Sequence, residues 1–249
     1  MSFADHFSGV SRGYAGFRPT YPLALFDWLA RQAPARDLAW DCATGSGQAA
    51  IDLARFFTRV VATDASAAQI GEAAPHARIE YRVAPAEASG IEAGSVDLVV
   101  VAQALHWFDA QRFNIEARRV LAPRGVIAQW CYGLTTVDGR AVDALVQHFY
   151  SAVVGPFWPA ERSHIEAGYR DLPFPFVRIE APGFAMAVDW TLPQLAGYLR
   201  TWSATTRFIA AHGLDPVVAL ERELAVHWGS PGAKRRVSWR LSLRVGRAG

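Results

Sequence analysis

Asp41 and the glycine turn that follows it are residues whose types and spacing could bind a ligand. Asp41 comes directly after the apolar residues 38–40, and Gly45 and Gly47 follow before an apolar helical pattern begins. Glycine permits a sharp turn or the close approach of a ligand because it has no Cβ. A strand–turn–helix also leaves free backbone N–H groups at the helix start, where a polar or anionic ligand can bind. Asp41 could accept hydrogen bonds from a cationic amine on that ligand.

A second acid, Asp64, ends the β-branched run at residues 60–63 and lies 23 residues after Asp41. An acid at about this spacing can accept hydrogen bonds from both hydroxyls of a ribose. Asp64 could instead be a turn residue that only supports a helix beginning at Ser66, since Ser66 and Gln69 have the spacing of a capping box. Taken together, the two acids and the turn favour the ribose role.

Further candidate residues follow the later strands of the pattern. Ligands bind outside the carboxyl ends of the strands in an open α/β sheet. The residues that come after the predicted strands at 79–83 and 96–101 include Ala86, Glu87, Gln103, His106 and Trp107. His106 is either a general base for a hydroxyl or amine acceptor or a hydrogen-bonded wall residue. Trp107 is either core packing or part of the wall of the same pocket.

Alternating strands and helices must position these residues. Strand patterns at 38–40, 60–63, 79–83, 96–101 and 126–130 alternate with helical patterns such as 66–74 and 109–121. The run at 96–101 is almost wholly apolar and β-branched, which is typical of a central strand buried on both faces. This alternation predicts an α/β fold with a doubly wound, mainly parallel sheet.

The second half of the chain has a different pattern. Helices are predicted at 141–154, from Thr191 to His212 and from Asp215 to Gly229, with a packed irregular segment at 155–175. Two segments near 184–190 and 237–245 alternate apolar and polar residues, which predicts strands buried on one face. We expect an antiparallel sheet edge with a helical cap inserted before the last strand.

Positive charge is concentrated at the end of the chain. The net charge is +2, and residues 231–249 contain six lysines and arginines and no acid. A basic segment of this kind could contact nucleic acid. Because the rest of the chain is mildly acidic, we interpret it instead as an edge strand protected by outward-facing arginines.

Composition sets further expectations. The chain has 249 residues, of which 51% are hydrophobic, so it suits one medium-sized domain. The apolar run at 96–105 is too short to span a bilayer, and residues 1–6 lack the pattern of a signal peptide. A cytoplasmic location is therefore expected, with Cys42 and Cys131 reduced and buried.

Several motifs together resemble one enzyme family. They are Asp41–Gln48, Val60–Ser66, Ala84–Glu87, Ser95–Val99, Ala104–Phe108 and Arg119–Val126. In these motifs the sequence resembles a class I S-adenosylmethionine-dependent methyltransferase of the trans-aconitate methyltransferase-like branch. The resemblance implies a Rossmann-like sheet of seven strands with an antiparallel last strand and a small helical cap. It also implies a single domain: an N-terminal lid and helix at 1–35, a cofactor-binding core at 36–133, substrate-side helices and cap at 134–235 with a strand near 176–190, and the last strand at 236–246.

The resemblance also implies roles for particular residues. S-adenosylmethionine is the expected cofactor, and its expected contacts are Tyr14, Arg18, Asp41, Ala43, Gly45, Gly47, Asp64, Ala65, Ala86, Glu87 and Gln103. His106 and Trp107 are the expected catalytic residues, and no metal is expected. The acceptor would be a small molecule, with a carboxylate as one candidate, rather than a nucleic acid or a membrane. Monomer and homodimer both remain open.

Two departures from the family pattern keep other interpretations open. Ala43 stands where the family usually has its first glycine, and Pro85 stands where many members have an acid facing the adenine amine. These changes are the support for a non-catalytic, cofactor-binding scaffold. A nicotinamide-dependent oxidoreductase is the other alternative, but its Gly-x-Gly-x-x-Gly pattern would place Ala50 at the third glycine.

Overall fold

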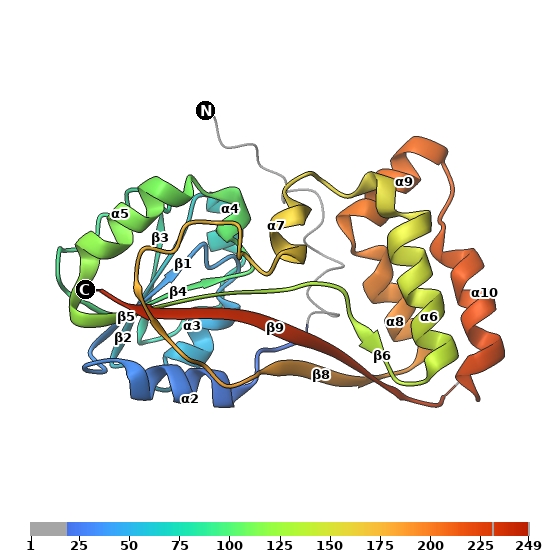
Figure 1. Ribbon diagram of the computed structural model, residues 1–249, viewed down its shortest axis with the longest axis horizontal. Helices are drawn as coiled ribbons and strands as arrows, with labels where there is room; N and C mark the ends of the chain where they lie inside the picture. The colour runs from blue at the N-terminus through green and yellow to red at the C-terminus, as the bar shows by residue number, and fades with distance from the viewer. Residues whose placement is uncertain (1–18, 231, 249) are drawn as a thin grey trace.

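Five parallel strands form the part of the sheet that carries the glycine turn (Figure 1). The computed structural model describes residues 19–230 and 232–248. The parallel strands lie in the order β3–β2–β1–β4–β5. Their bounds are β1 (Leu38–Cys42), β2 (Arg59–Asp64), β3 (Ile79–Val83), β4 (Val96–Ala102) and β5 (Leu121–Tyr132). The predicted doubly wound, mainly parallel sheet is confirmed.

Helices cover both faces of these strands. They are α2 (Leu23–Gln32), α3 (Gln48–Leu53), α4 (Ala67–Gly71) and α5 (Ala110–Val120). Successive strand residues point to opposite faces, so Ala39 packs in one buried cluster with α2 and α3, whereas Trp40 packs in a second with α5. Asp109 caps α5 by accepting hydrogen bonds from the amides of Gln111 and Arg112 at 3.2 and 3.1 Å. This predicted cap is confirmed.

The last strand, β9 (Arg235–Arg247), connects the two halves of the molecule. It runs antiparallel to β5 on one side. On its other side it pairs with β6 (Thr136–Val137), β7 (Val177–Ile179) and β8 (Ala185–Trp190). The expected strand near 176–190 is thus two strands, and the described residues form nine strands instead of seven.

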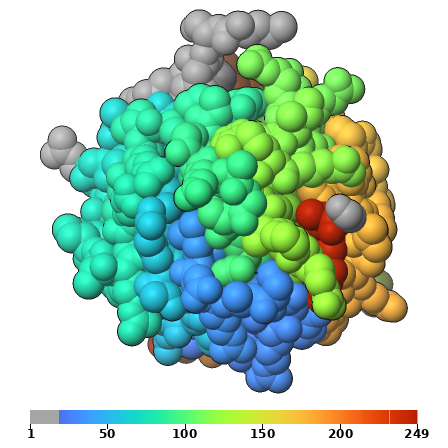
Figure 2. Space-filling view, turned by 90° about the vertical axis from the view of Figure 1, so that its left-hand side faces the viewer, coloured from blue at the N-terminus to red at the C-terminus, as the bar shows by residue number. Residues whose placement is uncertain are grey.

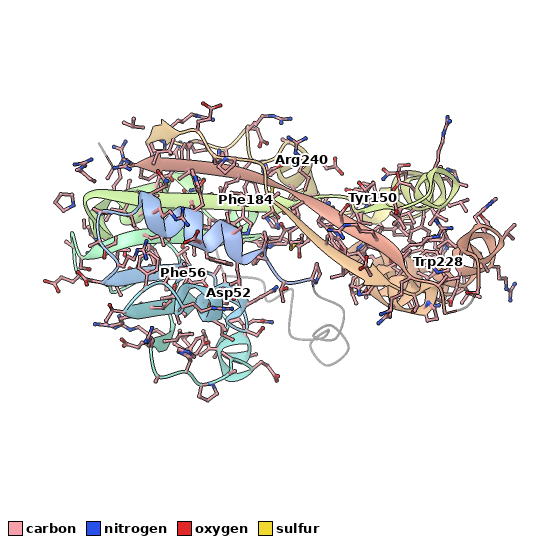
Figure 3. All side chains as sticks on the ribbon, turned by 90° about the horizontal axis from the view of Figure 1, so that it is seen from below. Asp52, Phe56, Tyr150, Phe184, Trp228 and Arg240 are labelled. Carbon is pink, nitrogen blue, oxygen red and sulfur yellow. The ribbon has the colours of Figure 1, made fainter. Side chains whose placement is uncertain are left out.

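The expectation that the last strand forms a protected edge is wrong. Hydrogen bonds flank β9 on both sides, and Figure 2 shows its red C-terminal end between green and orange segments of the chain. Arg240 is exposed on this strand (Figure 3), but Arg244 is only 6% exposed. Arg244 is covered because a segment that lies far away in the sequence, around Tyr169, packs over that end of β9.

Arg244 ties three parts of the fold together. Its guanidinium donates to the carbonyl oxygens of Tyr169 and Leu172, at 2.5 and 2.8 Å, and to Oε1 of Gln129, at 2.6 Å. Burial is the main cause that lowers the pKa of Arg244 to about 10, which still leaves it charged at neutral pH. A buried cation needs such partners because unpaired burial of charge is costly.

Helices gather beyond β9 as the predicted cap (Figure 1). The cap and the segment leading to it contain α6 (Arg140–His148), the π-helix η3 (Phe149–Val153), the 3₁₀ helix η4 (Gly155–Phe157), α7 (Arg162–Glu166), α8 (Leu192–Arg200), α9 (Ser203–His212) and α10 (Val217–Trp228). In Figure 1, α7 lies between the parallel strands and the other cap helices.

The single helix predicted from Thr191 to His212 is interrupted. Thr201 and Trp202 separate α8 from α9. The Thr201 hydroxyl donates to the Tyr198 carbonyl at 2.6 Å, and Trp202 takes an extended conformation. The Trp202 ring contacts Tyr150 and Tyr198 edge-on, with centroid distances of 5.6 and 5.8 Å. Aromatic packing in the cap therefore overrides the helical pattern.

Two expectations from composition can also be checked. Cys42 and Cys131 are buried and form no disulfide, as predicted. Burial raises the pKa of Cys131 to about 12, so this thiol stays protonated. In the part of the chain that the structure describes, no helix has both the length and the apolar character needed to cross a bilayer.

Replacing Arg244 tests the role of this buried cation. Arg244→Met leaves the carbonyls of Tyr169 and Leu172 and the Gln129 amide without their donor, so we expect a loss of about 2–4 kcal/mol in the free energy of unfolding. Arg240→Met on the exposed part of the same strand is the control and should change it by less than about 0.5 kcal/mol. Urea unfolding measures both, and equal losses would contradict the role given to Arg244.

Candidate functional site

The predicted site residues lie at the carboxyl ends of the parallel strands. Asp41 is in β1 one residue from its end, Asp64 ends β2 and Gln103 directly follows β4. Because these strands are neighbours and parallel, their ends share one edge of the sheet. This edge is where open α/β sheets bind ligands.

The turn after β1 has the backbone conformation that the glycines predict. The φ angles of Gly45 and Gly47 are +58° and +89°, in the left-handed region that glycine adopts readily. Gly47 also lies against the Tyr81 hydroxyl, which any Cβ at this position would meet. Ala43 has a φ of +56°, so the alanine found in place of the family's glycine is held in a strained conformation.

The Asp64 carboxylate lies against the glycine turn. Its Oδ2 accepts a hydrogen bond from the Gly45 amide at 2.9 Å, and its Oδ1 accepts one from the Ser66 amide at 2.8 Å. Ser66 in turn accepts a hydrogen bond from the Gln69 amide at 3.4 Å, so α4 is also capped. Each carboxylate oxygen can accept more than one hydrogen bond, so Asp64 keeps capacity for a pair of ligand hydroxyls.

Asp41 is fully buried and has one unsatisfied oxygen. Its Oδ2 accepts a hydrogen bond from the Thr44 hydroxyl at 2.5 Å, whereas Oδ1 has no hydrogen-bond partner among the described residues. Burial is the main cause that raises the pKa of Asp41 to about 7, and the nearby Asp64 raises it further. A cationic amine would supply both the missing hydrogen bond and the missing charge.

Tyr81 of β3 was not among the predicted site residues. Asp41, Ala62 and Tyr81 are register partners across three neighbouring parallel strands. The small Ala62 between them leaves room for the Tyr81 ring to reach Gly47. The Tyr81 hydroxyl is buried without a partner among the described residues, as is Asp41 Oδ1. Unpaired buried polar atoms are rare, and two of them beside one turn indicate a place for a polar ligand.

The predicted cofactor contacts Ala65, Ala86 and Glu87 lie after the ends of β2 and β3. Ala65 directly follows Asp64 and is half-buried, and Ala86 is buried. The Ala84 amide donates to the Asp64 carbonyl at 3.0 Å, which connects the chain after β3 to the end of β2. Glu87 accepts a hydrogen bond from the Asp109 amide at 3.0 Å through one oxygen, so its second oxygen is not used in that contact.

Gln103 has both ends of its side-chain amide engaged. Its Nε2 donates to the Tyr132 carbonyl at 3.0 Å, and its Oε1 accepts from the Tyr132 amide at 2.7 Å. Its φ of +57° lies in the left-handed region. This geometry indicates that Gln103 holds the end of β4 against the end of β5.

His106 and Trp107 lie in the 3₁₀ helix η2 (Leu105–Trp107), with ring centroids 4.7 Å apart. His106 Nδ1 is 3.0 Å from the hydroxyl of Tyr169, a buried residue that was not among the predicted site residues. Burial is the main cause that lowers the pKa of His106 to about 3, and the charges of Arg162 and His164 lower it further. A histidine with this pKa is neutral at pH 7 and a weak base, which favours the wall role over the general base.

Two of the predicted site residues cannot be placed. Tyr14 and Arg18 lie outside the residues that the structure describes. Their predicted contacts with the cofactor stay predictions.

The charges around this edge differ from one end to the other. Asp41 and Asp64 lie at the glycine turn. At the other end, α7 packs against η2 and brings Arg162 and His164 within electrostatic reach of His106. The glycine turn is therefore suited to a cation and to sugar hydroxyls. At the other end His164 is paired with Asp171 at 2.5 Å, which leaves Arg162 as the positive charge beside His106.

Comparisons with known proteins agree with this geometry. The family model of a methyltransferase domain matches residues 40–129, which include the glycine turn and both acids. A methyltransferase of Dictyostelium discoideum is 33% identical over 225 residues, covering 89% of this chain and 86% of its own. The methyltransferase Rv3342 of Mycobacterium tuberculosis is 35% identical over 179 residues, covering 67% of this chain and 70% of its own.

A solved structure is similar over nearly the whole chain. It is described as a type II methyltransferase from Anaeromyxobacter dehalogenans and is 48% identical in sequence, with a TM-score of 0.89. The match covers 93% of this chain and 98% of that one. The chain belongs to the class I S-adenosylmethionine-dependent methyltransferases. Its cofactor is S-adenosylmethionine. Membership of this family favours a methyltransferase over the nicotinamide-dependent oxidoreductase considered above.

The buried charge of Asp41 predicts a pH-dependent stability. The folded protein holds the Asp41 proton up to about pH 7, whereas the unfolded chain releases it near the ordinary value of 3.8. The wild type therefore loses stability from this group as the pH rises from about 4 to 7. Asp41→Asn has no proton to lose, so its free energy of unfolding should rise relative to the wild type across this window and stay higher at pH 8.

Urea unfolding of both proteins at pH 4.5, 6 and 8, without cofactor, measures this difference. A difference between the two proteins that is the same at all three pH values would contradict the raised pKa of Asp41.

Proposed function

We propose that this methyltransferase holds S-adenosylmethionine between the glycine turn and Asp64, and methylates a small acceptor that carries a carboxylate. The observation that carries the acceptor class is the environment of His106. This histidine is paired with the hydroxyl of buried Tyr169 and lies within electrostatic reach of Arg162 in α7.

The cofactor end is supported by unsatisfied polar atoms of the chain. The ammonium group of the cofactor would be held by Asp41, whose Oδ1 lacks a partner among the described residues. The ribose hydroxyls would be held by Asp64, whose oxygens keep acceptor capacity. The other predicted contacts remain part of this proposal: Tyr14, Arg18, Ala43, Gly45, Gly47, Ala65, Ala86, Glu87 and Gln103.

The chain's main task is to position the acceptor. S-adenosylmethionine, when bound, supplies a methyl group carried on a positively charged sulfur. Holding two reactants in line can lower a reaction barrier by ~7–11 kcal/mol without a covalent intermediate on the protein. His106 and Trp107 would wall the pocket in which the acceptor lies and exclude water from it.

The state of His106 favours an acceptor that needs no deprotonation. Hydroxyl and amine acceptors must lose a proton, and an efficient general base has a pKa near the working pH. The pKa of His106 is about 3, so it is poorly suited to that role. A carboxylate is already ionised at neutral pH, and its negative charge suits the Arg162 guanidinium near His106. The resemblance to the trans-aconitate methyltransferase-like branch points to the same acceptor class.

Methyl transfer to small acids tests this proposal. The protein would be incubated with S-adenosylmethionine labelled in its methyl group and with succinate, benzoate or trans-aconitate, each matched by its neutral amide. We expect labelled methyl ester from at least one acid and none from the amides. Since no base is required, kcat should change by less than about threefold between pH 6 and 8.

Two results would contradict the proposal. Transfer to amides or alcohols but not to acids would show a different acceptor class. Binding of S-adenosylhomocysteine without transfer to any compound would favour the non-catalytic scaffold.

A further inference from the structure

Arg162, the first residue of α7, is a cation that was not among the predicted site residues. Its guanidinium carbon lies 4.5 Å from the Trp158 ring centroid and 5.4 Å from that of Tyr150. Its Nε donates a hydrogen bond to the Tyr150 hydroxyl at 3.0 Å. The Tyr150 hydroxyl donates in turn to Glu166 at 2.7 Å. Two rings and one hydrogen bond thus hold the guanidinium in a single place.

The terminal nitrogens of Arg162 have no partner in the part of the chain that the structure describes. Arg162 forms no ion pair, and its two terminal nitrogens donate no hydrogen bond, among the residues that the structure describes. The side chain is half-buried. Terminal nitrogens held in one plane form the fork that matches the two oxygens of a carboxylate.

The position of Arg162 connects it to the candidate site. The short helix α7 packs against η2, which carries His106 and Trp107. The charge of Arg162 acts on His106 and also on Cys131, near the end of β5. Arg162 therefore lies at the acceptor side of the sheet edge, away from the two acids of the glycine turn.

An irregular helix contributes to this arrangement. Tyr150 (Figure 3) belongs to the π-helix η3, where the Val154 amide donates to the Phe149 carbonyl five residues earlier. The Trp158 indole donates to the Tyr150 carbonyl at 3.3 Å, which fixes both rings under Arg162. Single π-helical turns of this kind are rare and occur frequently at functional sites.

We propose that Arg162 binds a carboxylate of the acceptor through the two terminal nitrogens of its guanidinium, with Tyr150 and Trp158 holding it in place. This inference rests on the proposed function, because it assumes that the acceptor is an acid. Arg162 is a positioning and specificity residue: it holds the acceptor, and the wall formed by His106 and Trp107 directs it.

Kinetics and direct binding with three variants test Arg162. The wild type, Arg162→Gln and Arg162→Lys would be compared with Arg170→Gln, an exposed arginine shortly after α7 that serves as the matched control. Each protein is assayed for methyl transfer to the best acid among succinate, benzoate and trans-aconitate. Calorimetry measures the binding of the same acid to the complex with S-adenosylhomocysteine. Thermal unfolding and the Kd for S-adenosylhomocysteine show whether each variant is folded.

We expect the loss of the fork to weaken acid binding and not cofactor binding. Arg162→Gln should raise the KM and the Kd for the acid by about 10- to 100-fold, with kcat changed by less than about threefold. Arg162→Lys keeps the charge without the fork, so it should recover part of this loss. In Arg170→Gln the KM and the Kd for the acid should stay within about twofold of the wild-type values. The Kd for S-adenosylhomocysteine should stay within about twofold of the wild-type value in all three variants.

The two measurements separate this inference from the proposed function. If Arg162→Gln binds and methylates the acid as the wild type does, the proposal that Arg162 binds the acceptor is wrong, and the proposal that the acceptor is an acid is supported. If an acid binds in an Arg162-dependent way but is not methylated, the proposal that Arg162 binds a carboxylate is supported, and the proposal that the acceptor is an acid is wrong. If none of the three acids binds to the wild-type complex, the inference is overturned.

Discussion

The hydrogen bonds that Asp64 accepts from the backbone amides of Gly45 and Ser66 are the interaction on which the site depends. They join the turn after β1 to the end of β2, and so they fix the conformation of the glycine turn and the start of α4. Hydrogen bonds to an ionised carboxylate are about twice as strong as those between neutral groups. The same carboxylate keeps acceptor capacity for ligand hydroxyls, so one side chain both fixes the glycine turn and can contact a ligand.

Several features of the candidate site lower the stability of the free protein. Asp41 is buried with an unsatisfied oxygen, Tyr81 has a buried hydroxyl without a partner among the described residues, and Ala43 has a positive φ. Each of these features is unfavourable in the free protein. Features of this kind persist at functional sites because the surrounding structure holds them in place. Here the buried strands β2 and β4, which pair with β1 on its two sides, supply that support.

Local signals made the parallel half of the fold predictable from the sequence. The turn at Gly45 and Gly47 and the cap at Asp109 depend on neighbouring residues, and both are found where predicted. Features that depend on contacts between distant parts of the chain could not be predicted in this way. Arg244 sits in an alternating strand pattern, which suggests an outward side chain, but the segment around Tyr169 covers it. Tyr81 likewise belongs to the site only through its register with Ala62 and Asp41.

The central claim is that Asp64 holds the ribose of the cofactor, and a calorimetric double-mutant cycle tests it most directly. Wild type and Asp64→Asn would each be titrated with S-adenosylhomocysteine and with its 2′,3′-dideoxy analogue. If Asp64 holds the ribose, removing the two hydroxyls weakens binding to the wild type by about tenfold or more, and weakens binding to Asp64→Asn far less. An equal loss in both proteins would contradict it and would place the ribose contact elsewhere.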